Sequence, residues 1–165
     1  MRSLKQLFSN ILKKLTLQVC FLSSKNKIKK ILVPLDGSQN SVRGLKMAIT
    51  IARQCGATIT GIYSIHAPPH SEFKGVGSVS KSFNKEIEKF MNSAKVLSAQ
   101  NGIVFNKKIM RGEIGYNIVK LAQGKGNFNM IVIGSRGRSS TKQLFFGSVS
   151  NYVVHTSKIP VLLVK

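Results

Sequence analysis

Acidic residues are scarce in this sequence. Its 165 residues include 5 aspartates and glutamates against 26 lysines and arginines, which gives a formal net charge of +21 at pH 7. Such a surplus attracts polyanions, whether nucleotides, nucleic acids or anionic lipids, but the sign of the charge does not distinguish between them. A solvated basic surface without a specific partner is the alternative. The scarcity of carboxylates also leaves little with which to anchor a catalytic magnesium ion.

Cysteine is also rare, and the histidines are not spaced as metal ligands. Cys20 and Cys55 lie far apart and belong to no C-x-x-C pattern, so the sequence encodes neither a disulfide framework nor a zinc site. The three histidines, His66, His70 and His155, form no metal-binding pattern either. We therefore predict no protein-bound metal and expect a reducing, intracellular compartment.

A long uninterrupted apolar run is also missing from the first 30 positions. Lysines interrupt their apolar residues and no small-residue cleavage site follows, so we expect neither a membrane-spanning helix nor a secretory signal peptide. Apolar residues instead recur every three or four positions and form one helical stripe: Leu4, Leu7, Phe8, Ile11, Leu12, Leu15, Val19 and Leu22. Eight basic residues and no acid accompany them. We predict that residues 1–28 form a basic amphipathic helical extension.

Three interpretations of this extension stay open. Residues 1–24 could lie on an anionic membrane surface, because a basic amphipathic helix suits that interface. An acid-free amphipathic start also resembles an organellar presequence. Alternatively, the segment packs on the protein's own surface or frays.

From Lys29 onward, short β-branched runs alternate with helical patterns. The expected strands cover residues 31–35, 58–65, 104–109, 130–133 and 160–164, and the expected helices cover roughly 39–55, 83–97, 114–122 and 148–156. A polar loop at residues 66–81 is either a lid or disordered. Strict alternation predicts one α/β domain at residues 29–165, with a doubly wound five-stranded parallel sheet and helices on both faces.

Three sequence features follow the strands at the edge where such a sheet binds ligands. Asp36 comes directly after the first strand and could accept hydrogen bonds from ribose hydroxyls. It could equally cap the next helix or organise the turn. Residues 134–137, Gly-Ser-Arg-Gly, follow the fourth strand, and residues 147–150, Gly-Ser-Val-Ser, open the last helix.

Glycines and a helix N-terminus are the elements of a phosphate site, because backbone N–H groups can approach the phosphate oxygens closely. Ser148 and Ser150 could add hydroxyl donors, and Arg136, Arg138 and Lys142 add positive charge around the loop. The alternative is that the glycines serve turns and that the charges are solvated.

The spacing Gly134-x2-Gly137-x9-Gly147-Ser148 resembles the nucleotide-binding signature of the ATP-binding branch of the universal stress protein family. The resemblance covers about residues 29–165, including Val-Pro-Leu-Asp-Gly-Ser at 33–38 and Ile-Pro-Val-Leu-Leu-Val at 159–164. It implies a five-stranded parallel sheet of the adenine nucleotide alpha hydrolase type. The extension lies outside this pattern, and residues 127–129 lack the acid that the family often carries there.

The resemblance also implies roles for individual residues. Asp36 would contact the ribose, and Pro34, Leu35 and Ile65 would line the adenine cleft. The phosphates would be held by Gly134, Gly137, Gly147, Ser148, Val149 and Ser150, with Arg136 at a variable position between the glycines. Family members commonly form homodimers through the last strand, for which residues 161–164 are the candidate, and a cytoplasmic location is expected.

The residues for ATP turnover are not evident. The sequence contains no G-x-x-x-x-G-K-[ST] motif, and His66 is the only histidine placed for proton transfer. Any Mg²⁺ would be held by the phosphates and water. We predict an ATP-binding stress-response protein that acts as a nucleotide-dependent switch or sensor with little or no hydrolysis. The alternatives are a membrane-surface protein or a nucleic-acid-binding protein without nucleotide dependence. The latter ranks lower because no binding module or aromatic stacking array is present.

Overall fold

The computed structural model describes residues 27–66, 81–138 and 146–165. Three predicted features lie wholly or mostly outside them: the amphipathic helical extension of residues 1–28, of which only Lys27 and Ile28 are described and are not helical, the loop at 66–81, and Lys142. Among the described helices, none has the length and hydrophobicity that a membrane span requires.

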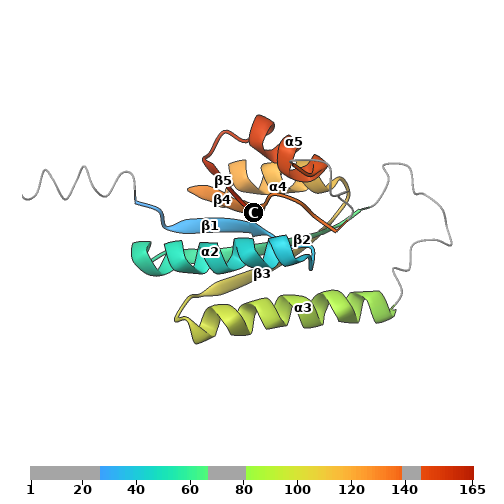
Figure 1. Cartoon of the computed structure of the whole chain (residues 1–165), viewed down its shortest axis with the longest axis horizontal. Coiled ribbons are helices and arrows are strands. Elements are labelled where there is room, and N and C mark those ends of the chain that lie inside the picture. The colour runs from blue at the N-terminus through green and yellow to red at the C-terminus, as the bar shows by residue number, and fades with distance from the viewer. Residues whose placement is uncertain (1–26, 67–80, 139–145) are drawn as a thin grey trace, which may run out of the picture.

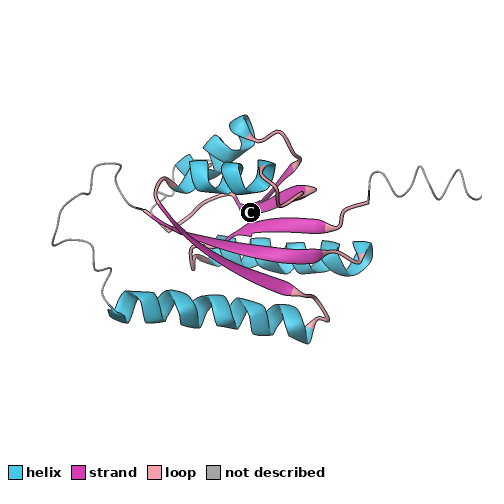
Figure 2. Cartoon of the chain, turned by 180° about the vertical axis from the view of Figure 1, so that it is seen from behind, coloured by secondary structure: helices cyan, strands magenta, loops and turns pink. Residues whose placement is uncertain are grey.

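Five strands form one parallel sheet in the order β3-β2-β1-β4-β5. The strands are β1 (Lys30–Pro34), β2 (Thr58–Ile65), β3 (Phe105–Arg111), β4 (Met130–Gly134) and β5 (Val161–Val164), and the helices are α2 (Gln39–Cys55), α3 (Lys81–Gln100), α4 (Ile114–Gln123) and α5 (Ser148–Thr156). Helices cover both faces of the sheet, with α2 and α3 on one side and α4 and α5 on the other (Figures 1 and 2). The predicted doubly wound α/β fold is confirmed.

Several predicted strand boundaries shift by one or two residues, and two of these shifts have clear physical reasons. Strand β3 continues past the expected residue 109 because Met110 and Arg111 still pair with the end of β2. Strand β5 begins after Pro160, not at it. The Pro160 carbonyl accepts a hydrogen bond from the Ile131 N–H at 2.9 Å, but proline has no N–H with which to continue the ladder.

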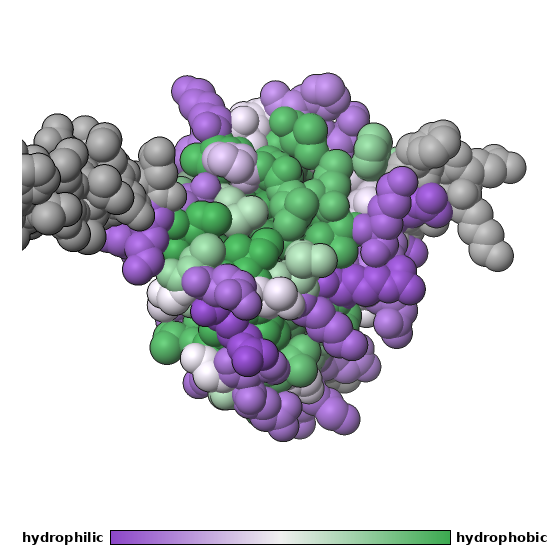
Figure 3. Space-filling view, turned by 60° about the vertical axis from the view of Figure 1, so that its left-hand side comes forward, coloured by the Kyte–Doolittle hydropathy of each residue, from purple (hydrophilic) through white to green (hydrophobic). Residues whose placement is uncertain are grey.

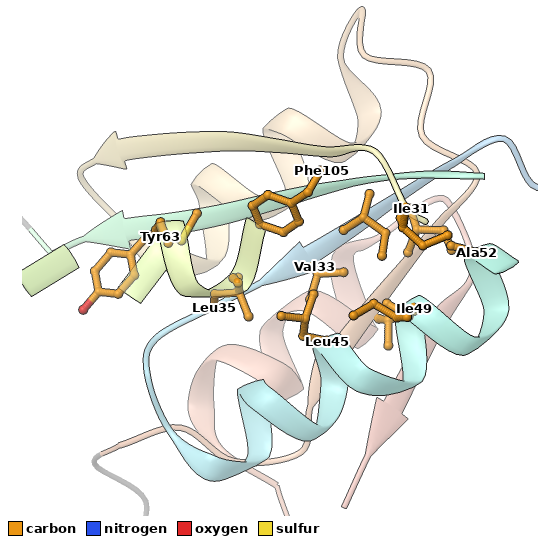
Figure 4. Packing of buried hydrophobic residues seen from close by; sticks show 14 of the residues in the cluster. Ile31, Val33, Leu35, Leu45, Ile49, Ala52, Tyr63 and Phe105 are labelled. Atoms are coloured by element: carbon orange, nitrogen blue, oxygen red, sulfur yellow. The ribbon is translucent and has the colours of Figure 1, made fainter. Parts of the chain in front are cut away.

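Strand β1 is the centre of the sheet and is buried on both faces. Ile31 and Val33 point into the core beneath α2 and α3, whereas Leu32 points into the core beneath α4 and α5. On the α2 side, Leu45 and Ile49 pack against these β1 side chains (Figure 4). A strand covered on both faces needs a continuous apolar run, which is the pattern of residues 31–35.

Helix α2 begins and ends with well-defined caps. The Ser38 side chain accepts a hydrogen bond from the Ser41 N–H at 3.1 Å, and the helix ends at Gly56, whose φ is 64°. A side-chain cap and a left-handed terminal residue fix both ends of a helix. The rigid α2 therefore sets the path of the turn that leaves β1 at Leu35 and Asp36.

The chain changes the direction in which it adds strands to the sheet, and the change lies between β1 and β4. From β1 the chain builds outward to β2 and β3 on one side, and then crosses to β4 and β5 on the other. The two sets of loops separate at the carboxyl ends of β1 and β4 and leave a crevice there, where ligands bind in sheets of this kind.

Candidate functional site

A cavity of about 510 Å³ opens at this reversal point. Its volume lies within the range of small-molecule binding sites. Ten of the residues predicted for the site line it: Pro34, Leu35, Asp36, Gly134, Arg136, Gly137, Gly147, Ser148, Val149 and Ser150. The fold therefore brings together three sequence segments, residues 34–36, 134–137 and 147–150, of which the first lies about a hundred residues before the other two.

Ile65 is the exception, because it is not among the residues that line the cavity. Side chains alternate between the two faces of a strand. Ile65 and Tyr63 point toward α2 and α3, where Ile65 is 8% exposed, whereas Ile62 packs beneath α4 and α5. Ser64 has the same parity as Ile62 and does line the cavity. Tyr63, on the same face as Ile65, also lines the cavity, so strand parity alone does not decide which residues of β2 reach it.

One side of the cavity is an apolar wall. It is formed by side chains from three strands and the two helices of this face: Pro34, Ile62, Ile114, Ile118, Ile133 and Val149. Ile114 and Ile118 belong to the helix expected at residues 114–122, and nothing in the sequence indicated that they reach the site. An apolar wall of this kind suits a flat aromatic ring.

Ser64 brings a hydroxyl group into this wall. The side-chain amide of Asn117, which is 6% exposed, lies 2.9 Å from Ser64 Oγ and 3.0 Å from the Arg111 carbonyl oxygen. A carbonyl only accepts, so the amide atom must be Nδ2, and its second hydrogen is directed to Ser64 Oγ. Among the described residues, no acceptor lies within hydrogen-bonding geometry of the Ser64 proton. Ser64 is therefore set to donate to an acceptor in the cavity.

Asp36 connects the turn after β1 with the loop after β4. Its Oδ1 accepts from the Ser38 N–H at 2.9 Å, and its Oδ2 accepts from the Arg138 N–H at 3.0 Å. Asp36 thus organises the turn, one of the two roles considered from sequence, while Ser38 serves as the helix cap. A carboxylate offers about four acceptor positions, so two remain for a ligand.

Two glycines permit the close approaches that build the site. A β-carbon on Gly137 would lie 2.7 Å from Asp36 Oδ2, and one on Gly134 would lie 2.7 Å from the Asn40 carbonyl. Real β-carbons do not approach other atoms so closely. Gly134 lets the start of α2 pack on the end of β4, and Gly137 lets the Asp36 carboxylate reach the loop backbone. Backbone packing therefore requires glycine at position 134, whereas at position 137 a β-carbon would push the Asp36 carboxylate away from its two backbone N–H partners.

The N-terminus of α5 faces the cavity. Gly147 is its N-cap residue and provides no side-chain hydrogen bond, so the helix dipole and the N–H groups of the first turn remain available at this end. Ser148 is exposed there, and Arg136 and Arg138 line the same part of the cavity. N–H groups, a helix dipole and two guanidinium groups together favour an anionic ligand.

Ser150 holds the start of α5 against the loop after β4. Its hydroxyl is 3% exposed and lies 2.8 Å from the Ser135 carbonyl oxygen and 2.9 Å from that of Gly147. Its single proton is directed to these two acceptors. Ser150 therefore positions the cavity-facing end of α5, in place of the direct hydroxyl donation expected from sequence.

His66 and Glu113 lie apart from the cavity. Glu113 caps α4 by accepting from the Gly115 N–H at 3.2 Å, and its other oxygen lies 3.9 Å from His66 Nδ1 in an exposed pair. Neither residue lines the cavity. Within the described ranges, no cluster of three or more histidines, cysteines or acids could hold a metal ion. The site as described is equipped for binding an anion beside an apolar wall.

Comparisons with known proteins agree with this fold. A universal stress protein of Methanocaldococcus jannaschii, MJ0531, is 29% identical over 146 residues, which are 87% of this chain and 85% of the relative. The structure of MJ0577 from the same organism superposes with a TM-score of 0.74 at 27% identity, covering 84% of this chain and 96% of that one.

A second solved structure is the universal stress protein of Archaeoglobus fulgidus in complex with dAMP. It superposes with a TM-score of 0.65 at 22% identity and covers 84% of this chain and 99% of that one. Residues 27–165 also match the profile of the universal stress protein family. This chain therefore belongs to the universal stress protein family.

Proposed function

We propose that the chain binds ATP in this cavity and acts in the cytoplasm as a nucleotide-dependent switch or sensor of the stress response, with little or no hydrolysis. The observation that carries the proposal is the arrangement of the cavity. An apolar wall, the Asp36 carboxylate and the N-terminus of α5 lie around one space of about 510 Å³. An adenine ring, a ribose and a phosphate chain require these three kinds of surface: an apolar wall, a hydrogen-bond acceptor and a group of N–H donors.

Each part of the nucleotide has a matching group. The apolar wall would hold the base, with Ser64 donating to a ring nitrogen. The two acceptor positions left on Asp36 would take hydrogen bonds from the ribose hydroxyls. The first turn of α5 and the loop after Gly134 would bind the phosphates, assisted by Arg136 and Arg138.

The Archaeoglobus fulgidus relative supports an adenine nucleotide, because its complex holds dAMP. The preference for a triphosphate rests on two further features. They are the spacing of Gly134, Gly137 and Gly147, and the positive charge of two arginines beyond the α5 N-terminus.

Mg²⁺ would be held mainly by the phosphates. Asp36 is the single carboxylate among the described residues that line the cavity, and both of its oxygens already accept backbone N–H groups. An ATPase normally also positions water with a base or a polar side chain. His66 and Glu113 lie outside the cavity lining, so we expect binding without efficient turnover.

The first test is ligand release from the purified full-length chain. Acid treatment followed by chromatography should yield adenine nucleotide, and ATP should raise the melting temperature more than GTP does. Radiolabelled ATP should remain largely intact during incubation. A nucleotide-free preparation whose melting temperature does not respond to ATP contradicts the proposal.

Ser148→Asp separates loss of binding from loss of folding. An acidic side chain in the first turn stabilises a helix by roughly 0.3–1 kcal/mol, but here its charge would repel the phosphates. We expect unchanged or higher thermal stability together with an ATP affinity reduced roughly tenfold or more. Ser148→Ala is the matched control and should change the affinity only slightly. Equal ATP affinity of the two variants would place the phosphates elsewhere.

A further inference from the structure

The end of the domain opposite the cavity carries a concentration of positive charge. In a parallel sheet all strands begin at one end, and every helix returns to it. Six exposed basic residues belong to this end and define what we call the basal surface: Lys27, Lys29, Lys30, Arg53, Lys125 and Lys158. Lys27 and Lys29 precede β1, and Lys30 is its first residue. Arg53 is in the last turn of α2, and Lys125 and Lys158 lie in the connections that lead into β4 and β5.

Hydrogen bonds hold these connections side by side. Asn129 Oδ1 accepts from the backbone N–H groups of Lys29 and Lys30 at 2.8 and 3.0 Å. The Lys29 carbonyl accepts from the Thr58 N–H at 2.9 Å, and Lys30 Nζ donates to the Gly126 carbonyl at 3.2 Å. The start of β1 is thus attached to the connections before β2 and β4, so the basic residues share one end of a rigid body.

No acid among the described residues compensates this charge. Asp36 and Glu113 follow the ends of β1 and β3, at the opposite end of the sheet. Glu86 and Glu88 lie in the first half of α3, which also begins at the opposite end (Figure 1). The basal surface therefore carries six positive charges without a nearby acid among the described residues, whereas the basic residues elsewhere are interspersed with the four described acids.

The N-terminal sequence enters the fold at the same place. Residues 1–26 precede Lys27 and contain Arg2, Lys5, Lys13, Lys14 and Lys25 without any acid. Their apolar residues follow the helical stripe described above. In sequence, a basic segment with an apolar helical pattern therefore leads directly into the basal surface at Lys27. Polybasic surfaces next to an amphipathic segment are typical of binding to anionic lipid.

Among the described residues, the exposed aromatic side chains lie at the other end, so they provide no stacking surface for nucleic acid at the basal surface. Tyr116 is in the first turn of α4, Phe146 precedes α5, and the Tyr152 ring lies over Gly115 at the start of α4. Single-stranded nucleic acids stack their bases on aromatic side chains. The exposed apolar side chain next to the basal surface is instead aliphatic, namely Val104, which is 62% exposed and precedes β3.

We infer that the basal surface docks on an anionic lipid bilayer and that the cavity at the opposite end faces the water. Each lysine or arginine near an anionic membrane strengthens binding roughly fivefold. Six such residues on one surface favour reversible recruitment. This orientation leaves the cavity accessible, so the docking does not depend on whether a nucleotide is bound.

The test is vesicle flotation with two charge-reversed forms of the full chain. The basal variant combines Lys27→Glu, Arg53→Glu, Lys125→Glu and Lys158→Glu. The control variant combines Lys46→Glu, Lys85→Glu, Lys89→Glu and Lys120→Glu, which changes the net charge equally at exposed positions of α2, α3 and α4. Circular dichroism and thermal melting establish that both variants fold.

The parent should float with phosphatidylcholine vesicles that contain roughly 30 mol% phosphatidylserine, and not with phosphatidylcholine alone. The basal variant should bind roughly tenfold or more weakly, whereas the control variant should stay within about threefold of the parent. Equal losses in the two variants would reduce the effect to net charge and overturn the inference. So would a parent that ignores the vesicles and binds duplex or single-stranded nucleic acid.

Lysine footprinting provides a second readout of the orientation. Vesicle-bound protein is treated with an amine-reactive reagent and analysed by mass spectrometry. Lys27, Lys125 and Lys158 should become protected, whereas Lys46 and Lys85 should react as they do in solution. Protection of the second group in place of the first contradicts the orientation, even if the vesicles are bound.

Discussion

At the scale of the residue, Ser64 is the group whose orientation is most informative. Asn117 Nδ2 occupies the acceptor side of the Ser64 hydroxyl at 2.9 Å, so the proton is available to the cavity. If the base lies on the apolar wall, Ser64→Ala should weaken ATP binding roughly two- to tenfold, the equivalent of one hydrogen bond. Isothermal titration calorimetry measures this loss. Ser93→Ala on the exposed face of α3 is the control, and an unaltered affinity in both variants would exclude the contact.

Gly137 offers a second test at this scale, independent of any ligand. The β-carbon of Gly137→Ala would lie 2.7 Å from Asp36 Oδ2, so we expect a loss of about 1–3 kcal/mol in the free energy of unfolding. Urea denaturation measures it. Adding Asp36→Ala removes the carboxylate from the clash, so the double variant should lose less than the sum of the two single changes. If the losses in the free energy of unfolding are strictly additive, the two residues are not in contact.

The same residues show what could be predicted from the sequence and what could not. Motif spacing identified Gly134, Gly137 and Gly147, although the contacts that require glycine at 134 and 137 come from residues about a hundred positions earlier. For Asp36, the turn contact with the Ser38 N–H could be expected from the sequence, but the Arg138 N–H reaches it only through the order of strands in the sheet. Ile65 was predicted from the family pattern alone, and the position of its side chain in the core depends on the packing of α2 and α3.

At the scale of the element, strands and helices followed from hydrophobic periodicity. Strand β2 and helix α5 coincide with the expected ranges, because their apolar patterns are bounded by clear turn residues. The end of β3 did not follow, since Lys107 and Lys108 carry charged side chains on an edge strand and the pairing with β2 decides its length. Long-range pairing is the information that local patterns lack.

Helix α5 depends on Ser150, which holds its first turn against Ser135. Ser150→Ala removes the hydroxyl donor from the Ser135 and Gly147 carbonyls, each of which keeps one backbone N–H donor. We therefore expect a loss of about 0.5–1.5 kcal/mol in stability and faster amide exchange at residues 148–152. ATP binding should weaken with it, because the phosphate-facing N–H groups lose their position. The control is Ser98→Ala, which removes an equally buried serine hydroxyl from α3, where it donates to the Ala94 carbonyl. That control should leave ATP affinity unchanged; if it does not, the effect of Ser150 is general instability.

At the scale of the whole molecule, the three proposed interactions involve different regions, namely the two ends of the sheet and one of its edges. The cavity lies at the carboxyl ends of the strands and the basal surface at their beginnings, so a nucleotide and a membrane would not compete for space. The edge formed by β5 is a third region. Its four residues, Val161–Val164, are apolar and only half buried. Apolar residues also gather on one face in Figure 3, and an exposed apolar edge invites pairing with another chain.

We propose that β5 pairs with its counterpart in a second copy of the chain to form a homodimer. Sedimentation velocity should show a dimer for the parent, and Leu162→Lys should shift it to a monomer, because a charge in the paired edge disfavours association. Val96→Lys places the same charge on an exposed position of α3, 55% accessible, and should leave the dimer intact. A parent that sediments as a monomer at all concentrations removes the proposal. Dissociation by both variants would instead indicate a general effect of added charge.

If the dimer forms, its two cavities and two basal surfaces belong to one particle, so membrane binding should strengthen with protein concentration as the monomers associate.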